Sequence, residues 1–255
     1  VGDLTLRGGV VTPGHNAQVT VKATGRDVRV ESVGTAALAP QSALGRLRIE
    51  AQNITQAGRL VAPFGQIDLV AQGNLVLTPD SITSVAAQPG QVLLGGTLQN
   101  GVDWLIDGLN PVDQLPEKSV RLSGGAVDVQ SGAQVNVSGG GDLQAYEFTA
   151  GPGGSRDILT DQNTYAVLPG YQGGFAPGNA QETTGRPVGE AVYLSGVPGL
   201  PDGVYTLLPA HYALLPGGMA VRVGNTTPLL PGQAYTRQDG VRVAAGYITD
   251  SRANA

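Results

Sequence analysis

Short alternating stretches dominate the chain, and their central apolar residues recur, for the most part, every six to eight positions. Two such stretches, 45–51 and 65–71, begin with Gly and place Leu47 and Ile67 at equivalent positions 20 residues apart. Alternation of apolar and polar side chains is typical of a half-buried strand, so each stretch is predicted to be a short strand. The apolar anchors are Leu47, Ile54, Leu60, Ile67, Leu75, Ile82 and Val92, followed after a gap by Val120, Val127 and Val135, with the series ending near Leu143.

Three steps of this series make one period of about 20 residues, which indicates three short strands per turn of the chain. Stacked turns would pair their strands in parallel and bury one apolar stripe. The pattern therefore predicts an all-β fold, with a right-handed parallel β-helix (a triangular solenoid) over residues 1–145. No 3.6-residue apolar spacing is sustained, which disfavours helical repeats. An antiparallel sandwich is the alternative, but Asn100-Gly101 is the only Asn-Gly hairpin dipeptide in the sequence.

The composition agrees with many short elements around an aliphatic core. Gly and Pro number 39 and 17 in 255 residues, and aromatic residues make up only 5%. A net charge of −5 offers no basic stripe for nucleic acid. No apolar run approaches the roughly 20 residues of a transmembrane helix, so the chain is not expected to span a membrane. Cysteine is absent, which excludes disulfides and thiolate sites.

Residues 98–117 interrupt the repeats and carry the only Trp, Trp104. Repeat proteins place such insertions outside their coils. Trp104 and its apolar neighbours Leu105 and Ile106 are expected to cover the flank of the coils, because exposed aromatic clusters are costly. A surface recognition patch at Trp104 is the alternative.

After Leu143 the texture changes, and residues 146–255 contain all eight tyrosines and several Leu-Pro turns. Proline ends strands and sets turns, so this part is predicted to be a β-rich module of short antiparallel hairpins. Open strand edges invite pairing with other chains, and repeat proteins need terminal caps. The module is therefore expected to cap the solenoid.

Some residues of this module are candidates for a structural or recognition role. Arg156 and Asp157, with Tyr146, are candidates for a junction between the two parts, either as a buried ion pair or as an ordinary surface pair. The tyrosines are expected to fill the core or stack between hairpins, while a sugar-binding face is the alternative. On that alternative, the candidate recognition residues are Trp104, Tyr205, His211 and Tyr212.

Catalytic and metal-binding patterns are weak in this sequence. The two histidines, His15 and His211, lie far apart in the chain, whereas a metal site needs clustered ligands. A polysaccharide-cleaving enzyme needs two converging carboxylates. The acidic candidates are Glu50 with Asp68, and the set Asp103, Asp107 and Asp113. Neither set recurs at the coil spacing, so the chain is predicted not to be an enzyme and to need no cofactor.

Four segments resemble large exoproteins of the filamentous haemagglutinin type: GDLQAYEF at 141–148, GGSRDIL at 153–159, VYLSG at 192–196 and GLPDGVYTLLPAHYALLPG at 199–217. The resemblance implies a substrate of two-partner secretion, exported through a dedicated outer-membrane transporter and located outside the cell or on the bacterial surface. It also implies roles in adhesion, virulence or biofilm formation, with glycans or host or bacterial receptors as partners.

The expected function is therefore that of a structural and adhesive segment of a secreted fibre. The chain opens at Val1 directly on a strand-like stretch, so we expect a segment of a larger protein. Two alternatives remain: a carbohydrate-active enzyme on a β-helix, and a passive scaffold that presents an effector.

Overall fold

The computed structural model describes residues 2–34, 39–152, 154–171, 176–179, 190–224, 229–230, 232–238 and 240–250. The fold is all-β, as predicted, and its helical content is limited to the short 3-10 helices η1 (Ile158–Thr160) and η2 (Ala210–Leu214) in these residues. The chain divides into two compact units. The first contains Val1–Ala145 together with Gly178–Ala180, and the second contains Tyr146–Pro177 and Gln181–Ala255.

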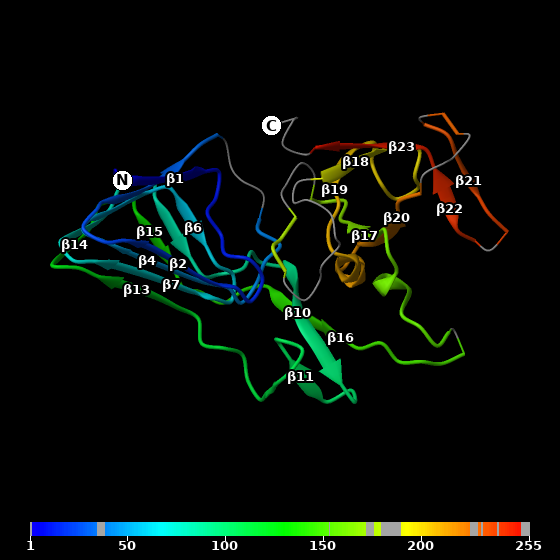
Figure 1. Ribbon diagram of the computed structural model, residues 1–255, viewed down its shortest axis with the longest axis horizontal. Coiled ribbons are helices and arrows are strands. Elements are labelled where there is room, and N and C mark those ends of the chain that lie inside the picture. Colours follow the sequence, from blue (N-terminus) through cyan, green and yellow to red (C-terminus); the bar gives the residue numbers. More distant parts are fainter. Residues whose placement is uncertain are drawn as a thin grey trace. The chain divides into compact units, whose positions relative to one another are not determined.

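Three parallel sheets make up most of the first unit (Figure 1). The first sheet has the strand order β1 (Leu4–Gly8), β3 (Val28–Ser32), β5 (Ile54–Ala57), β8 (Asn74–Leu77) and β14 (Ala126–Val129). The second sheet has the order β2 (Gln18–Ala23), β4 (Arg46–Ala51), β7 (Gln66–Ala71) and β13 (Ser119–Ser123). The third sheet has the order β6 (Arg59–Val61), β9 (Ile82–Ser84) and β15 (Gln134–Asn136).

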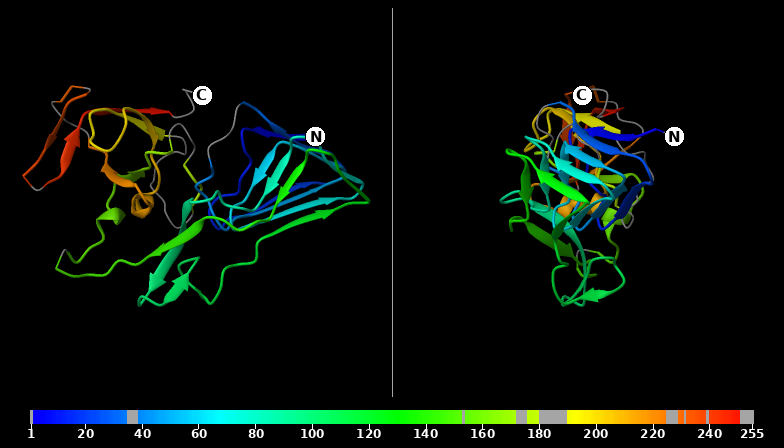
Figure 2. Two further views of the ribbon diagram at one scale, coloured as in Figure 1. Left: turned by 180° about the vertical axis from the view of Figure 1, so that it is seen from behind. Right: turned by 90° about the vertical axis from the view of Figure 1, so that its left-hand side faces the viewer.

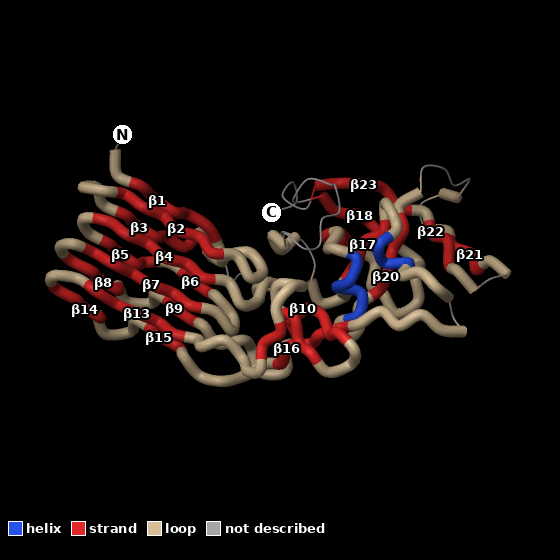
Figure 3. Tube along the Cα trace, turned by 60° about the horizontal axis from the view of Figure 1, so that its bottom comes forward, coloured by secondary structure: helices blue, strands red, loops and turns tan. Residues whose placement is uncertain are grey.

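The chain passes through the three sheets repeatedly in the same order, and we call one such passage a round. Strands β4, β5 and β6 belong to the second, first and third sheets, and β7, β8 and β9 repeat that order, as do β13, β14 and β15. Figure 3 shows the strands of each sheet side by side in this sequence. The same strands are seen from behind in Figure 2. The described strand pairs of these three sheets are all parallel, which rules out the antiparallel sandwich for this part of the unit.

Apolar side chains of equivalent rounds lie next to one another in register. Leu47 is paired with Ile67, and Ile67 with Val120. In the first sheet Ile54 is paired with Leu75. Leu47, Ile54, Leu60, Ile67 and Leu75 are buried in one cluster, as the spacing predicts. Burial of these aliphatic columns is the main favourable term for the fold of this unit.

Two of the predicted anchors have other positions. Thr83, not Ile82, is paired with Leu60 and points inward, while Ile82 is paired with Arg59 on the outer face. Because side chains alternate between faces, this shift of one residue moves Ile82 out of the core. Val92 is half-buried and belongs to a different sheet.

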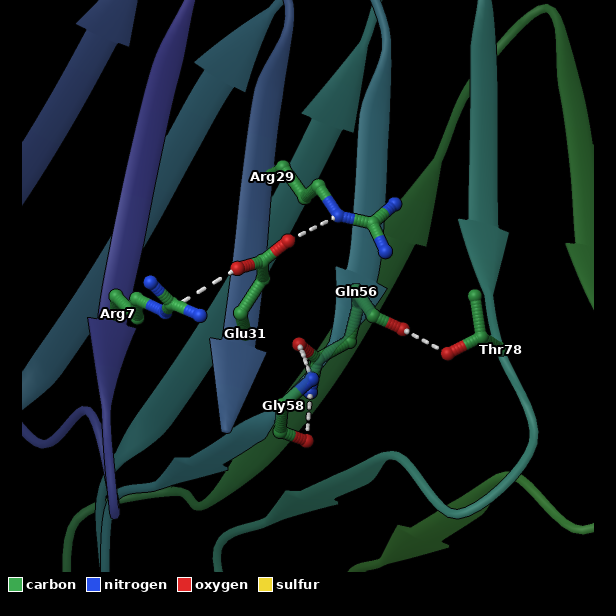
Figure 4. A network of polar contacts seen from close by, with 6 residues as sticks. All are labelled: Arg7, Arg29, Glu31, Gln56, Gly58 and Thr78. Atoms are coloured by element: carbon green, nitrogen blue, oxygen red, sulfur yellow. Dashed lines mark hydrogen bonds and ion pairs between the residues drawn. The ribbon is translucent and has the colours of Figure 1, made fainter. Parts of the chain in front are cut away.

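A buried amide explains why Thr83 points inward. The Gln56 side chain is fully buried and donates to the Gly58 carbonyl (3.1 Å), the Ile82 carbonyl (3.0 Å) and Thr83 Oγ1 (3.3 Å). The Gly58 backbone N–H donates back to Gln56 Oε1 at 3.2 Å (Figure 4). A buried amide without such partners would be strongly destabilising. An inward Ile82 would remove the hydroxyl that accepts from Gln56.

The outer faces of the first and second sheets carry ion pairs within strands and between neighbouring strands. Glu31 lies between Arg7 (3.5 Å) and Arg29 (2.6 Å), as Figure 4 shows. On the second sheet, Arg48 contacts Glu50 (2.6 Å) and Asp68 (3.3 Å). The hydrogen bond from Arg48 lowers the pKa of Glu50. These exposed pairs contribute little individually, but they keep the outer faces polar.

The insertion contributes two strands to a fourth sheet, whose strand order is β12 (Pro111–Val112), β11 (Asp103–Leu105), β10 (Val92–Gln99) and β16 (Asp142–Tyr146). Strands β10 and β11 form an antiparallel hairpin. Its turn contains Asn100 (φ 55°) and Gly101 (φ 67°), the conformation that a tight hairpin turn requires at both central positions.

The second unit is built from antiparallel pairs. They join β17 (Thr164–Val167) to β20 (Met219–Arg222), β18 (Glu190–Leu194) to β19 (Gly203–Thr206) and to β23 (Gly246–Asp250), and β21 (Ala234–Thr236) to β22 (Arg242–Ala244). Tyr165 and Tyr205 are among the buried residues of its core. Tyr193 and Tyr247 stack across one pair with ring centroids 5.0 Å apart.

Glycine allows successive rounds to approach closely at one corner of the first unit. Gly45 and Gly65 immediately precede β4 and β7. A Cβ on Gly65 would overlap the carbonyl oxygen of Gly45, and a Cβ on Gly45 would lie 2.6 Å from the carbonyl oxygen of Gly14. A side chain at either position would therefore push two rounds apart.

We expect Gly65→Ala to destabilise the first unit by about 1–3 kcal/mol, the usual range for overpacking. Urea unfolding followed by the fluorescence of Trp104 measures this, because Trp104 is the only Trp and lies in the first unit. Gly139→Ala is the matched control, since a Cβ at Gly139 meets nothing within 4 Å. Equal unfolding midpoints for the two variants would contradict the close approach.

Candidate functional site

A groove of about 260 Å³ lies on the outer face of the third sheet. Outward side chains of this sheet, Arg59 and Val61 from β6 with Ile82 and Ser84 from β9, contribute to its floor. Its walls are formed by 39–40 on one side and 86–91 on the other. The Gln91 side chain joins the walls by donating to the Pro40 carbonyl at 2.8 Å. The groove is thus formed by segments that are 51 residues apart in sequence.

The groove differs in chemistry from the outer faces of the other two sheets. Its aliphatic lining includes Val10, Val61 and Ile82, together with Pro40, Pro63 and Pro89. Arg59 is its cation, and no ion pair of Arg59 is present in the described part of the chain. Arg7, Arg29 and Arg48 each have a carboxylate partner. The groove therefore combines an apolar lining with one uncompensated positive charge.

This groove was not predicted from the sequence. The one available signal was the stretch from Arg59 to Val61, where Val61 is apolar at a position that should face outward. The walls gave no sign of their proximity, because they lie on either side of two rounds of the chain.

The predicted junction residues meet different partners from those expected. Arg156 does not pair with Asp157; its guanidinium is exposed and lies 3.2 Å from Asp161. The Asp157 carboxylate instead lies 2.8 Å from His211 Nε2 and also accepts from the backbone N–H of Leu159 (2.9 Å), which caps η1. His211 is 54 residues beyond Asp157 in the sequence, and the fold of the second unit brings the two side chains together.

Tyr146 belongs to the same cluster. Its ring stacks on His211 with a centroid distance of 4.3 Å and an angle of 15° between planes. His211 is 8% exposed. Tyr146, Asp157 and His211 thus form a partly buried polar cluster within the second unit. Burial and stacking indicate a structural role for this cluster, and little of the His211 side chain is exposed.

The other recognition candidates are also packed against protein. Tyr205 and Tyr212 are fully buried, and the Tyr205 hydroxyl donates to the Pro201 carbonyl. Neither ring is exposed at the surface, and both are part of the packed interior of the second unit. Trp104 is half-buried against the cluster that contains Leu93 and Ile106, and its indole N–H donates to the Gly95 carbonyl at 2.8 Å. This packing accounts for the aromatic ring in the insertion.

Three of the acidic candidates, Glu50, Asp68 and Asp107, have partners that account for their positions. Glu50 and Asp68 each bind Arg48 on an outer face. Asp107 accepts from the backbone N–H groups of Asn110 (2.8 Å) and Leu109 (2.9 Å). These bonds, with one from the Asn110 side chain, lower the pKa of Asp107 to about 2. A general acid needs a raised pKa, whereas the turn that donates to the Asp107 carboxylate lowers its pKa.

Within the described residues, no three His, Cys, Asp or Glu side chains gather as a possible metal site. His15 lies in the first unit, where its backbone N–H donates to the Gly178 carbonyl at 2.6 Å. None of the described helices has the length and apolar character needed to cross a membrane.

No protein-family model, curated protein or solved structure matches the chain. The candidate function therefore depends on the geometry and on the resemblance in sequence.

We expect Asp157→Ala to destabilise the second unit by about 1–3 kcal/mol, because it removes a helix cap and the partner of a buried ring. Near-ultraviolet circular dichroism reports on this unit, since all eight tyrosines lie within it. Arg156→Ala is the adjacent control and should cost less than about 0.5 kcal/mol, as expected for an exposed pair. A larger loss for Arg156→Ala than for Asp157→Ala would contradict the stabilising role of the Asp157 contacts with Leu159 and His211.

Proposed function

We propose that residues 1–145 form a right-handed parallel β-helix of triangular cross-section, with 98–117 inserted between two rounds. The support is the rotation of the chain through three parallel sheets, with Leu47 and Ile67 in register 20 residues apart. The right hand is the one taken by about 98% of crossovers between parallel strands. Such a stack can grow by adding rounds, and each round needs only its neighbours.

We further propose that the chain is a structural and adhesive segment of a secreted bacterial surface fibre. The observation that carries this proposal is the same rotation, because a stack of parallel rounds gives a long, stiff rod whose outer faces are free for contact. The resemblance to filamentous haemagglutinin-type exoproteins at 141–148, 153–159 and 192–217 points the same way. The full-length protein would then use a two-partner secretion transporter of the outer membrane.

Adhesion predicts that beads coated with the chain bind host or bacterial cells, or immobilised glycans, in a saturable manner, and that free chain competes for this binding. The control is beads coated with the same chain after thermal unfolding. The same preparation is incubated with acidic polysaccharides, and the release of reducing ends is measured. Binding without turnover supports the adhesin. Turnover would identify a carbohydrate-active enzyme, and neither binding nor turnover would leave a passive scaffold, so both results overturn the proposal.

We also propose that the module at 146–255 caps the β-helix. Strands β13, β14 and β15 are each at the edge of their sheet. The proposal is supported by these unpaired edges and by the change from parallel to antiparallel strands after β16. Exposed apolar edge strands promote aggregation unless they are covered.

Truncation tests the cap. A chain that ends at Gly141 loses β16 as well as the module, whereas one that ends at Phe148 keeps β16. We expect both to aggregate or to unfold at lower urea concentration than the full chain, as measured by light scattering and Trp104 fluorescence. If the chain ending at Phe148 is monomeric and as stable as the full chain, the module is not a cap.

A further inference from the structure

We propose that the groove on the third sheet binds a short aliphatic carboxylate, such as a fatty acid of roughly six to eight carbons. This inference does not depend on the adhesive role. It follows from three properties of the groove: its apolar lining, its single cation and its size.

The lining favours an aliphatic body. Val61 and Ile82 both face outward into the groove, whereas the ion pairs of Glu31 and Arg48 lie on the outer faces of the other sheets. Pro40 and Pro89 add apolar surface from the two walls. An alkyl chain in this groove would remove apolar surface of both partners from water. The hydrogen bond from Gln91 to Pro40 holds the walls together without a ligand, so the site is preformed.

The polar groups of the groove favour an acceptor with negative charge. Arg59 offers guanidinium donors that no carboxylate in the described residues occupies. Asn136 Oδ1 accepts from the backbone N–H (3.0 Å) and the hydroxyl (2.6 Å) of Ser138, which leaves the amide N–H groups of Asn136 as donors. A planar carboxylate can accept two parallel hydrogen bonds from one guanidinium.

An acidic sugar fits this site less well. A uronate presents hydroxyl groups along its whole length, and these would face Val10, Val61 and Ile82 without hydrogen-bond partners. Such unpaired hydroxyls are costly. The volume of about 260 Å³ is also near the lower end for ligand pockets, which suits a ligand of about ten heavy atoms.

Titration calorimetry of the full 255-residue chain with sodium octanoate tests the proposal. We expect one saturable site for octanoate. The Arg59→Gln variant should bind octanoate at least about tenfold more weakly, and the unchanged chain should bind the neutral analogue octanamide at least about tenfold more weakly than octanoate. Val61→Thr keeps a β-branched residue in the strand but makes the floor polar, so it should weaken octanoate binding severalfold. Arg46→Gln is the matched control, because Arg46 is an exposed strand arginine outside the groove, and its affinity should be unchanged.

Unfolding followed by Trp104 fluorescence checks that each variant keeps its fold. Three results would overturn the proposal: no octanoate binding up to about 10 mM, equal binding by the folded Arg59→Gln variant, or tighter binding of galacturonate than of octanoate. These outcomes are distinct from a failure of cell adhesion, which would leave octanoate binding intact.

Discussion

In-register stacking of aliphatic side chains determines nearly everything else in the first unit. Leu47, Ile67 and Val120 occupy equivalent places in three neighbouring strands of the second sheet. Because strand side chains alternate, this register also decides which residues face outward. A shift by one residue would exchange the core for the charged face that carries Arg48. The buried columns and the outer surface are thus one arrangement.

The core also admits a polar side chain from the first sheet, Gln56 of β5, which is bonded to Thr83 of the third sheet. Gln56 occupies a core position and is satisfied by the Gly58 and Ile82 carbonyls and by Thr83. The Gln56 amide favours an inward Thr83, with which it forms a hydrogen bond. Because neighbouring side chains of a strand point to opposite faces, Ile82 then points outward. The place of Ile82 in the lining of the groove is therefore linked to a hydrogen-bonded amide in the core. A change at Gln56 would affect both stability and the surface of the groove.

The spacing of anchors predicted the parts of the fold that depend on local alternation and repetition. Leu47, Ile54, Leu60 and Ile67 are buried as expected. The prediction failed where a distant partner decides the outcome. Ile82 matched the spacing, but the phase of its strand depends on Gln56, 26 residues earlier.

Contacts between distant segments limited the prediction of side-chain clusters in the same way. Asp157 and His211 are 54 residues apart, and Gln91 and Pro40 are 51 apart. No local pattern marks such pairs. Arg156 was predicted to pair with Asp157 only because the two residues are adjacent in sequence. Tyr146, Asp157 and His211 were all candidates from the sequence. Their contacts with one another were not predicted.

The separation between inner columns and outer faces also shows where function can vary. Arg59 and Val61 contribute to the floor of the groove, while the buried Leu60 between them is part of the core. The walls at 39–40 and 86–91 lie outside the strands of the three parallel sheets. Substitution of outward or wall residues changes the chemistry of the groove without opening a cavity in the aliphatic columns. A stack of this kind can therefore acquire a binding site at one round while its neighbours keep only a structural role.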